Sequence, residues 1–73
     1  DYIVNAVYEW FDERANVYER NGEIFAIVCA NERALIYWCM QYGESVELLS
    51  PEKTRKKLCE IISSMKERYE KNV

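Results

Sequence analysis

The chain has 73 residues, of which 49% are hydrophobic, and it contains only two glycines and one proline. That length allows one small domain, and that composition excludes a disordered or low-complexity chain. The longest apolar run, residues 34–40, is much shorter than the roughly 18 residues that a membrane-crossing helix needs. Residues 1–5 lack the basic and apolar regions of a secretory signal, and their abrupt start suggests a piece of a longer protein.

The net charge of −3 is unevenly distributed along the chain. Residues 1–51 hold nine acidic and three basic residues, which gives −6, whereas residues 52–73 hold four acidic and seven basic residues, which gives +3. Because phosphate backbones attract basic proteins, the acidic total makes the chain as a whole a poor candidate for binding nucleic acid.

The first predicted elements are a helix and a β-hairpin. Apolar residues recur three and four positions apart over residues 3–11, which predicts a helix with one apolar side. Asn21-Gly22 then separates two apolar runs, and this pair favours a type I′ turn, in which both central residues have positive φ. A two-residue turn fixes the register, so that Tyr18 lies opposite Phe25.

A second helix, a short strand and a last helix follow. The second helix is predicted over residues 32–42, with Asn31 as its N-cap and Gly43 as its left-handed C-terminal residue. Its core side carries Leu35, Trp38, Cys39 and Tyr42. Residues 45–49 alternate as in a strand, and Ser50-Pro51-Glu52 starts the last helix with a serine cap and a proline in the first helical position. The apolar stripe of that helix consists of Leu58, Ile61, Ile62, Met65 and Tyr69.

The order α-β-β-α-β-α indicates an α+β fold, and the hairpin in it is apolar on both faces. With the helices mainly on one face of a three-stranded sheet, we expect six residues of that face to be buried: Val17, Ile24, Ala26, Val28, Val46 and Leu48. The other face then exposes Tyr18, Phe25, Ile27 and Leu49, a patch of the kind that marks an interaction surface. Helices on both faces would bury this patch instead. The second helix offers either a second contact or a fully buried surface through three further apolar residues, Ile36, Tyr37 and Met40.

The side chains needed for catalysis or metal binding are scarce. The chain has no histidine, and it has no glycine-rich phosphate loop, so we expect no enzyme activity and no cofactor. Cys29, Cys39 and Cys59 are odd in number and ten or twenty residues apart, which fits neither a disulfide framework nor a zinc site. We expect them to be reduced, buried thiols of a cytoplasmic protein.

The stretch from Leu35 to Glu52 resembles the C-terminal extension, or WCX domain, of bacterial WYL-domain transcriptional regulators. The resemblance rests on a helix with Trp38, an aromatic residue before Gly43, the strand-like Val46-Glu47-Leu48-Leu49, and Pro51 before a closing helix that ends near Tyr69. At the level of pattern it extends over all 73 residues, as one domain. The family has a strand just before the first helix, whereas this sequence begins after it, so that strand is absent or supplied by another chain.

The resemblance implies a ferredoxin-like two-layer sandwich and a role without chemistry of its own. The parent protein would read DNA through a helix-turn-helix and sense a small-molecule or nucleotide effector in a middle domain. The present module would help the protein to dimerise or would frame the effector site. It would bind a neighbouring domain or a second copy, forming a homodimer, and transmit the effector state. The Trp-Tyr-Leu motif belongs to the preceding domain, so none of its ligand contacts transfer to this chain. The alternative is a stand-alone ferredoxin-like module that binds a small molecule or oligomerises.

Two further surfaces allow more than one interpretation. The basic run Lys53, Arg55, Lys56 and Lys57 forms a solvated helix face, contacts nucleic acid, or docks onto an acidic neighbour such as the −6 segment of a second copy. Aromatic residues on an open sheet also bind RNA by stacking, and Tyr18 and Phe25 would allow it. The net acidic charge of the hairpin and its lack of an RNA-binding strand motif disfavour that function.

Overall fold

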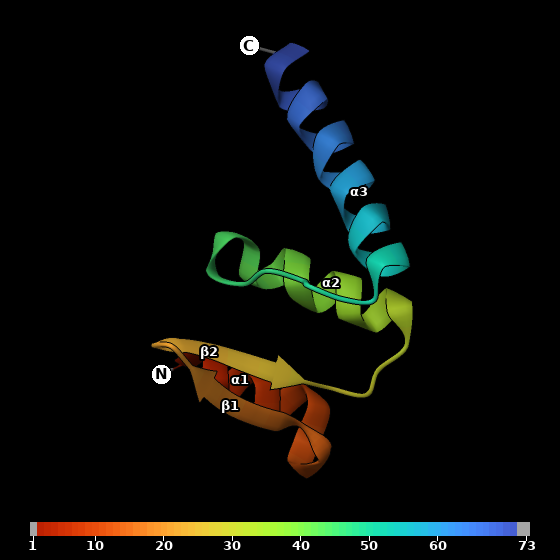
Figure 1. Cartoon of the computed structure of the whole chain (residues 1–73). Coiled ribbons are helices and arrows are strands. Elements are labelled where there is room, and N and C mark those ends of the chain that lie inside the picture. Colours follow the sequence, from red (N-terminus) through yellow and green to blue (C-terminus); the bar gives the residue numbers. More distant parts are fainter. Residues whose placement is uncertain (1, 72–73) are drawn as a thin grey trace. The chain divides into compact units, whose positions relative to one another are not determined.

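The computed structural model describes residues 2–71 and has an α+β architecture (Figure 1). The chain divides into two compact units, residues 1–35 and residues 36–73. The first unit contains a helix and a β-hairpin, and the second contains most of a short helix and one long helix. The predicted α+β class is therefore confirmed.

The hairpin of the first unit has the predicted turn and register. Strands β1 (Asn16–Arg20) and β2 (Glu23–Ile27) pair antiparallel, with Tyr18 opposite Phe25. The two turn residues, Asn21 and Gly22, have φ values of 54° and 82°. Only glycine adopts such a conformation without strain, and asparagine is among the residues that tolerate it best, so two residues fix the whole ladder.

Helix α1 (Tyr2–Phe11) supplies the core of the first unit. Ala6, Val7 and Phe11 are buried along one side of it, together with Ala15 just beyond it. The predicted apolar side was too broad, because Tyr8 and Trp10 lie outside this core and are 44% and 52% exposed. The spacing of apolar residues therefore predicted the helix correctly but overestimated how many of its side chains are buried.

A short 3₁₀ helix (Asp12–Arg14) turns the chain from α1 towards β1. Asp12 has a φ of 56°, and its carboxylate accepts hydrogen bonds from the Arg14 backbone N–H at 2.9 Å and from the guanidinium at 3.2 and 3.1 Å. The side-chain hydrogen bond from Arg14 is the main cause that lowers the pKa of Asp12. Aspartate tolerates positive φ when its side chain bonds locally, so these contacts stabilise the turn.

Helix α2 (Glu32–Tyr42) begins in the first unit and continues into the second. Its ends agree with the prediction, since Asn31 Oδ1 accepts a hydrogen bond from the Ala34 N–H at 2.8 Å and Gly43 has a φ of 51°. Ile36, Trp38 and Cys39 are buried, and the Trp38 ring lies 4.8 Å from that of Tyr42 between centroids.

The predicted strand over residues 45–49 is not formed. Residues 43–45 form a 3₁₀ helix, residues 46–51 have no regular secondary structure, and the sheet within residues 2–71 has two strands instead of three. Val46 is nevertheless extended, with φ −137° and ψ 157°. A strand needs a neighbour that accepts its backbone hydrogen bonds, and none of the described segments pairs with this one.

Helix α3 (Glu52–Lys71) is the longest element, at 20 residues. The Arg55 N–H donates to the Pro51 carbonyl oxygen at 2.9 Å, so Pro51, and not Ser50, holds the N-cap position. Of its residues only Thr54 and Leu58 are buried, both in the first two turns. The rest of its apolar stripe is exposed, with Ile62 at 52%, Met65 at 43% and Tyr69 at 73%.

We expect Gly22→Ala to destabilise the hairpin, because alanine in the left-handed conformation costs about 1–2 kcal/mol. No atom lies within 4 Å of a Cβ built at Gly22, so the loss would come from the backbone and not from a clash. Urea unfolding of the 73-residue chain measures this free energy. Asn21→Gly is the matched control, and an unchanged stability of the Gly22→Ala chain would contradict this account of the turn.

Candidate functional site

The first candidate surface is the hairpin face, which we define as Tyr18, Phe25 and Ile27. Tyr18 and Phe25 stack across the strands with ring centroids 5.5 Å apart and an interplanar angle of 20°. Tyr18 is 41% and Ile27 60% exposed, whereas Phe25 is half-buried. Tyr18 and Ile27 therefore present a large part of their surface to water, at a cost of about 25 cal/mol per Å² of apolar area.

The opposite face of the hairpin is less buried than predicted. Val17 and Val28 are half-buried, but Ile24 is 52% exposed and Ala26 is also exposed. The expectation that this face forms the core was wrong for Ile24 and Ala26. The buried residues of the first unit lie instead on and just after α1, so the alternation of the strands did not tell which face the core would occupy.

The remaining interface candidates differ from one another in exposure. Leu49 is 53%, Tyr37 57% and Met40 37% exposed, so all three are accessible. Ile36 is only 6% exposed, and we leave it out of the candidate surface because a buried side chain cannot meet a partner. Val46 and Leu48, predicted to be buried, are half-buried.

Arg55, one turn into α3, binds the extended segment before it. One guanidinium nitrogen, Nη1, donates to Glu47 Oε2 at 2.8 Å and to the Leu48 carbonyl oxygen at 2.7 Å. The hydrogen bond and charge of Glu47 raise the pKa of Arg55 above its ordinary value. Because one side chain bonds two consecutive residues, it ties the segment that follows the extended Val46 to α3, although no strand among residues 2–71 pairs with this segment. The sequence analysis missed this role and counted Arg55 only as part of the basic run.

The other members of the basic run, Lys53, Lys56 and Lys57, lie on the exposed surface of α3. Further along the helix is an open depression of about 390 Å³, lined by Lys57, Glu60, Ile61, Ser64, Met65 and Arg68. All of these residues belong to α3, so the depression is a surface of one helix and not an enclosed pocket.

The three cysteines differ in their burial. Cys39 is buried in α2, and burial raises the pKa of its thiol, which keeps that thiol protonated. Cys29 and Cys59 are exposed, so the prediction that all three are buried was wrong for these two. Within residues 2–71 no three Cys, Asp or Glu side chains gather closely enough to hold a metal ion. No helix in the same range is long and apolar enough to span a bilayer.

The comparison with known families gives one match. The model of the WCX domain matches residues 1–66, which include the whole first unit and the second unit up to residue 66, with most of α3. No curated protein and no solved structure matches the sequence.

We expect Arg55→Ala to loosen residues 46–49, because the substitution removes both hydrogen bonds made by Nη1. The heteronuclear ¹⁵N relaxation of residues 46–49 should then report faster motion on the ps–ns timescale. Lys56→Ala, at the next and exposed position, is the control and should leave these residues unchanged. Glu47→Gln should have a smaller effect, since the bond to the Leu48 carbonyl remains. Equal relaxation in the Arg55→Ala and Lys56→Ala chains would show that Arg55 does not order the segment.

Proposed function

The chain belongs to the WCX domain family, and on that premise we propose that it serves as the non-catalytic contact module of a WYL-type transcriptional regulator. The WCX domain is a regulatory accessory domain at the C-terminus of such regulators. DNA would be read by the helix-turn-helix of the parent protein, and an effector would be bound elsewhere in it. This module would bind a neighbouring domain or a second copy and transmit the effector state through that contact.

The observation that supports this proposal most strongly is the exposed hairpin face. Tyr18 and Ile27 present apolar surface on a rigid two-stranded ladder, and the stacked Phe25 supports Tyr18 from the adjacent strand. Aromatic side chains held in a fixed conformation lose little entropy on binding, which suits a protein–protein contact. Burial of these side chains would provide the affinity, and the charged helices would set the orientation.

The finer fold assignment is also part of the proposal. Two observations support a ferredoxin-like sandwich in the complete regulator: the hairpin lies between two helices along the chain, and Val46 is extended in a segment that Arg55 binds at Glu47 and Leu48. In that arrangement this segment would complete the sheet by pairing with a strand from outside the described residues.

The family-level proposal can be tested by reading the coding DNA upstream of the codon for Asp1. We expect a helix-turn-helix and then a domain with a Trp-Tyr-Leu motif, with a short strand-forming segment directly before the chain. An unrelated domain there would contradict the regulator proposal and favour a stand-alone module that binds a small molecule or oligomerises.

The contact surface itself can be tested with two isoleucines of the same strand. Ile27→Glu puts a charge on the hairpin face, whereas Ile24→Glu puts the same charge on the opposite face at similar exposure. We expect Ile27→Glu to weaken self-association of the chain, measured by sedimentation equilibrium, while Ile24→Glu leaves it unchanged. Circular dichroism checks that both variants keep their helix content. Equal effects of the two substitutions would mean that the hairpin face is not the contact.

A further inference from the structure

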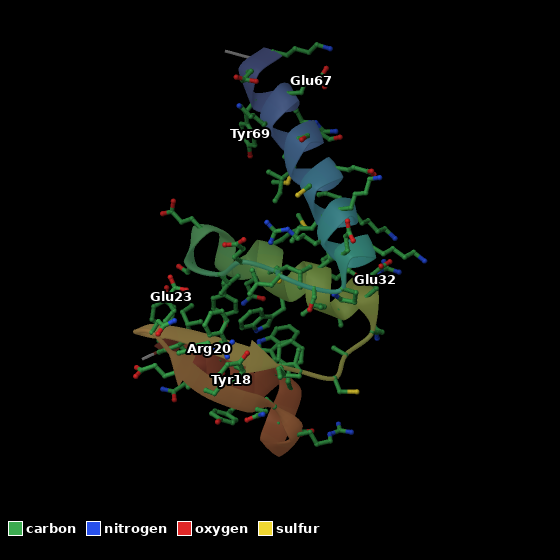
Figure 2. The ribbon with its side chains drawn as sticks, in the orientation of Figure 1. Tyr18, Arg20, Glu23, Glu32, Glu67 and Tyr69 are labelled. Carbon is green, nitrogen blue, oxygen red and sulfur yellow. The ribbon has the colours of Figure 1, made fainter. Side chains whose placement is uncertain are left out.

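The apolar stripe of α3 is exposed along most of its length. Leu58 is buried, but Ile62, Met65 and Tyr69, which we define as the α3 stripe, are 52%, 43% and 73% exposed. From Leu58 onwards these residues are spaced by four, three and four positions, so they lie along one side of the helix. Figure 2 shows Tyr69 and Glu67 projecting from opposite sides of α3, with Tyr69 on the side of the stripe.

Basic side chains border the α3 stripe on both sides. At about 100° per residue, Lys66 lies on one flank of the stripe, and Lys57 and Arg68 lie on the other. The depression beside Met65 is lined by Lys57 and Arg68, and also by Glu60, Ile61 and Ser64, so its charge is net positive. A partner for this surface therefore has to be apolar in the middle and acidic overall.

The first 51 residues of this chain have that character. They carry a net charge of −6 against +3 for residues 52–73, and they contain the exposed hairpin face. The widths of the hairpin and of α3 are also similar, since a two-stranded ribbon is about 10 Å wide and a helix with its side chains is about 10–12 Å wide. The five-residue strands and the span from Leu58 to Tyr69 are both roughly 17 Å long.

We propose that the α3 stripe binds the hairpin face of a second copy of this chain, with Lys66 and Arg68 towards its acidic segment. This inference rests on the dimerisation part of the proposed function and names the two surfaces that meet. Met65 would contact the stacked rings of Tyr18 and Phe25, because a thioether packs favourably against aromatic rings. The basic side chains beside the stripe would add cation–π interactions with the same rings.

A second copy could cover both the α3 stripe and the hairpin face. Each chain carries one stripe and one hairpin face, so a reciprocal pair of chains would make the same contact twice. A specific interface buries at least about 1,200 Å² in total, so two such contacts would meet this requirement better than one.

The test uses Met65→Glu and Ile27→Glu in the 73-residue chain, studied by sedimentation equilibrium. Each variant should raise the dimer dissociation constant at least about tenfold, which is about 1.4 kcal/mol. Ser63→Glu, on the outer side of α3, and Ile24→Glu are the matched controls and should leave the constant unchanged. Met65 and Ile27 are exposed, and circular dichroism confirms that the variants fold.

Mixing the two variants decides whether the surfaces meet across copies. In a mixed dimer both substitutions fall in the same contact, and the other contact joins an unchanged stripe to an unchanged hairpin face. An equimolar mixture should therefore dimerise more strongly than either variant alone. This recovery is specific to a reciprocal contact between two different surfaces.

Four results would overturn the inference. If Met65→Glu dissociates the dimer and Ile27→Glu does not, the stripe pairs with another stripe. If only Ile27→Glu dissociates the dimer, the hairpin face binds something other than the stripe, and the proposed function stands. If both variants dissociate and the mixture does not recover, the two surfaces do not meet across copies. If the unaltered chain is monomeric at all concentrations, the dimerisation part of the proposed function fails with the inference, whereas the upstream sequence still tests the family-level proposal.

Discussion

The structure depends on one geometric constraint: a chain of 73 residues has too much surface for its volume to cover all its apolar side chains. Nearly half of the residues are hydrophobic, yet no large side chain among residues 2–71 falls below 2% exposure. A domain of this size buries only about 60% of the surface that its unfolded chain exposes. Some of the apolar side chains left over lie on the hairpin face and the α3 stripe, so the property that limits stability also leaves surfaces available for binding.

Local signals in the sequence predicted the local structure well. The Asn21-Gly22 pair determined the turn and the register, and the Asn31 cap and Gly43 determined the ends of α2. Each of these features depends on the backbone preference of one or two residues and on bonds to near neighbours. Such preferences act in the same way whatever the rest of the chain does, and for that reason a single sequence is enough to read them.

Features that depend on distant partners could not be read in the same way. The alternation of residues 45–49 predicted a strand, but a strand forms only beside another one, and no described segment supplies it. The spacing in α3 correctly placed Ile62, Met65 and Tyr69 on one side of the helix, but spacing does not reveal whether anything covers that side. The hairpin face was accessible to sequence analysis because alternation on both faces already indicated more apolar surface than one core needs. Sequence analysis could not predict the burial of Ile36 or the exposure of Ile24.

The hydrogen bond from Arg55 to the Leu48 carbonyl has a consequence for how far an assembly of these chains can grow. In an extended segment, residues 46 and 48 present their backbone groups to one edge, and residues 47 and 49 present theirs to the other. The guanidinium occupies the Leu48 carbonyl on the first edge, so a strand from outside would pair without displacing that bond only at the second. Open-ended stacking requires both edges, as in fibrils. The arginine would thus favour the addition of one strand over open-ended stacking on both edges.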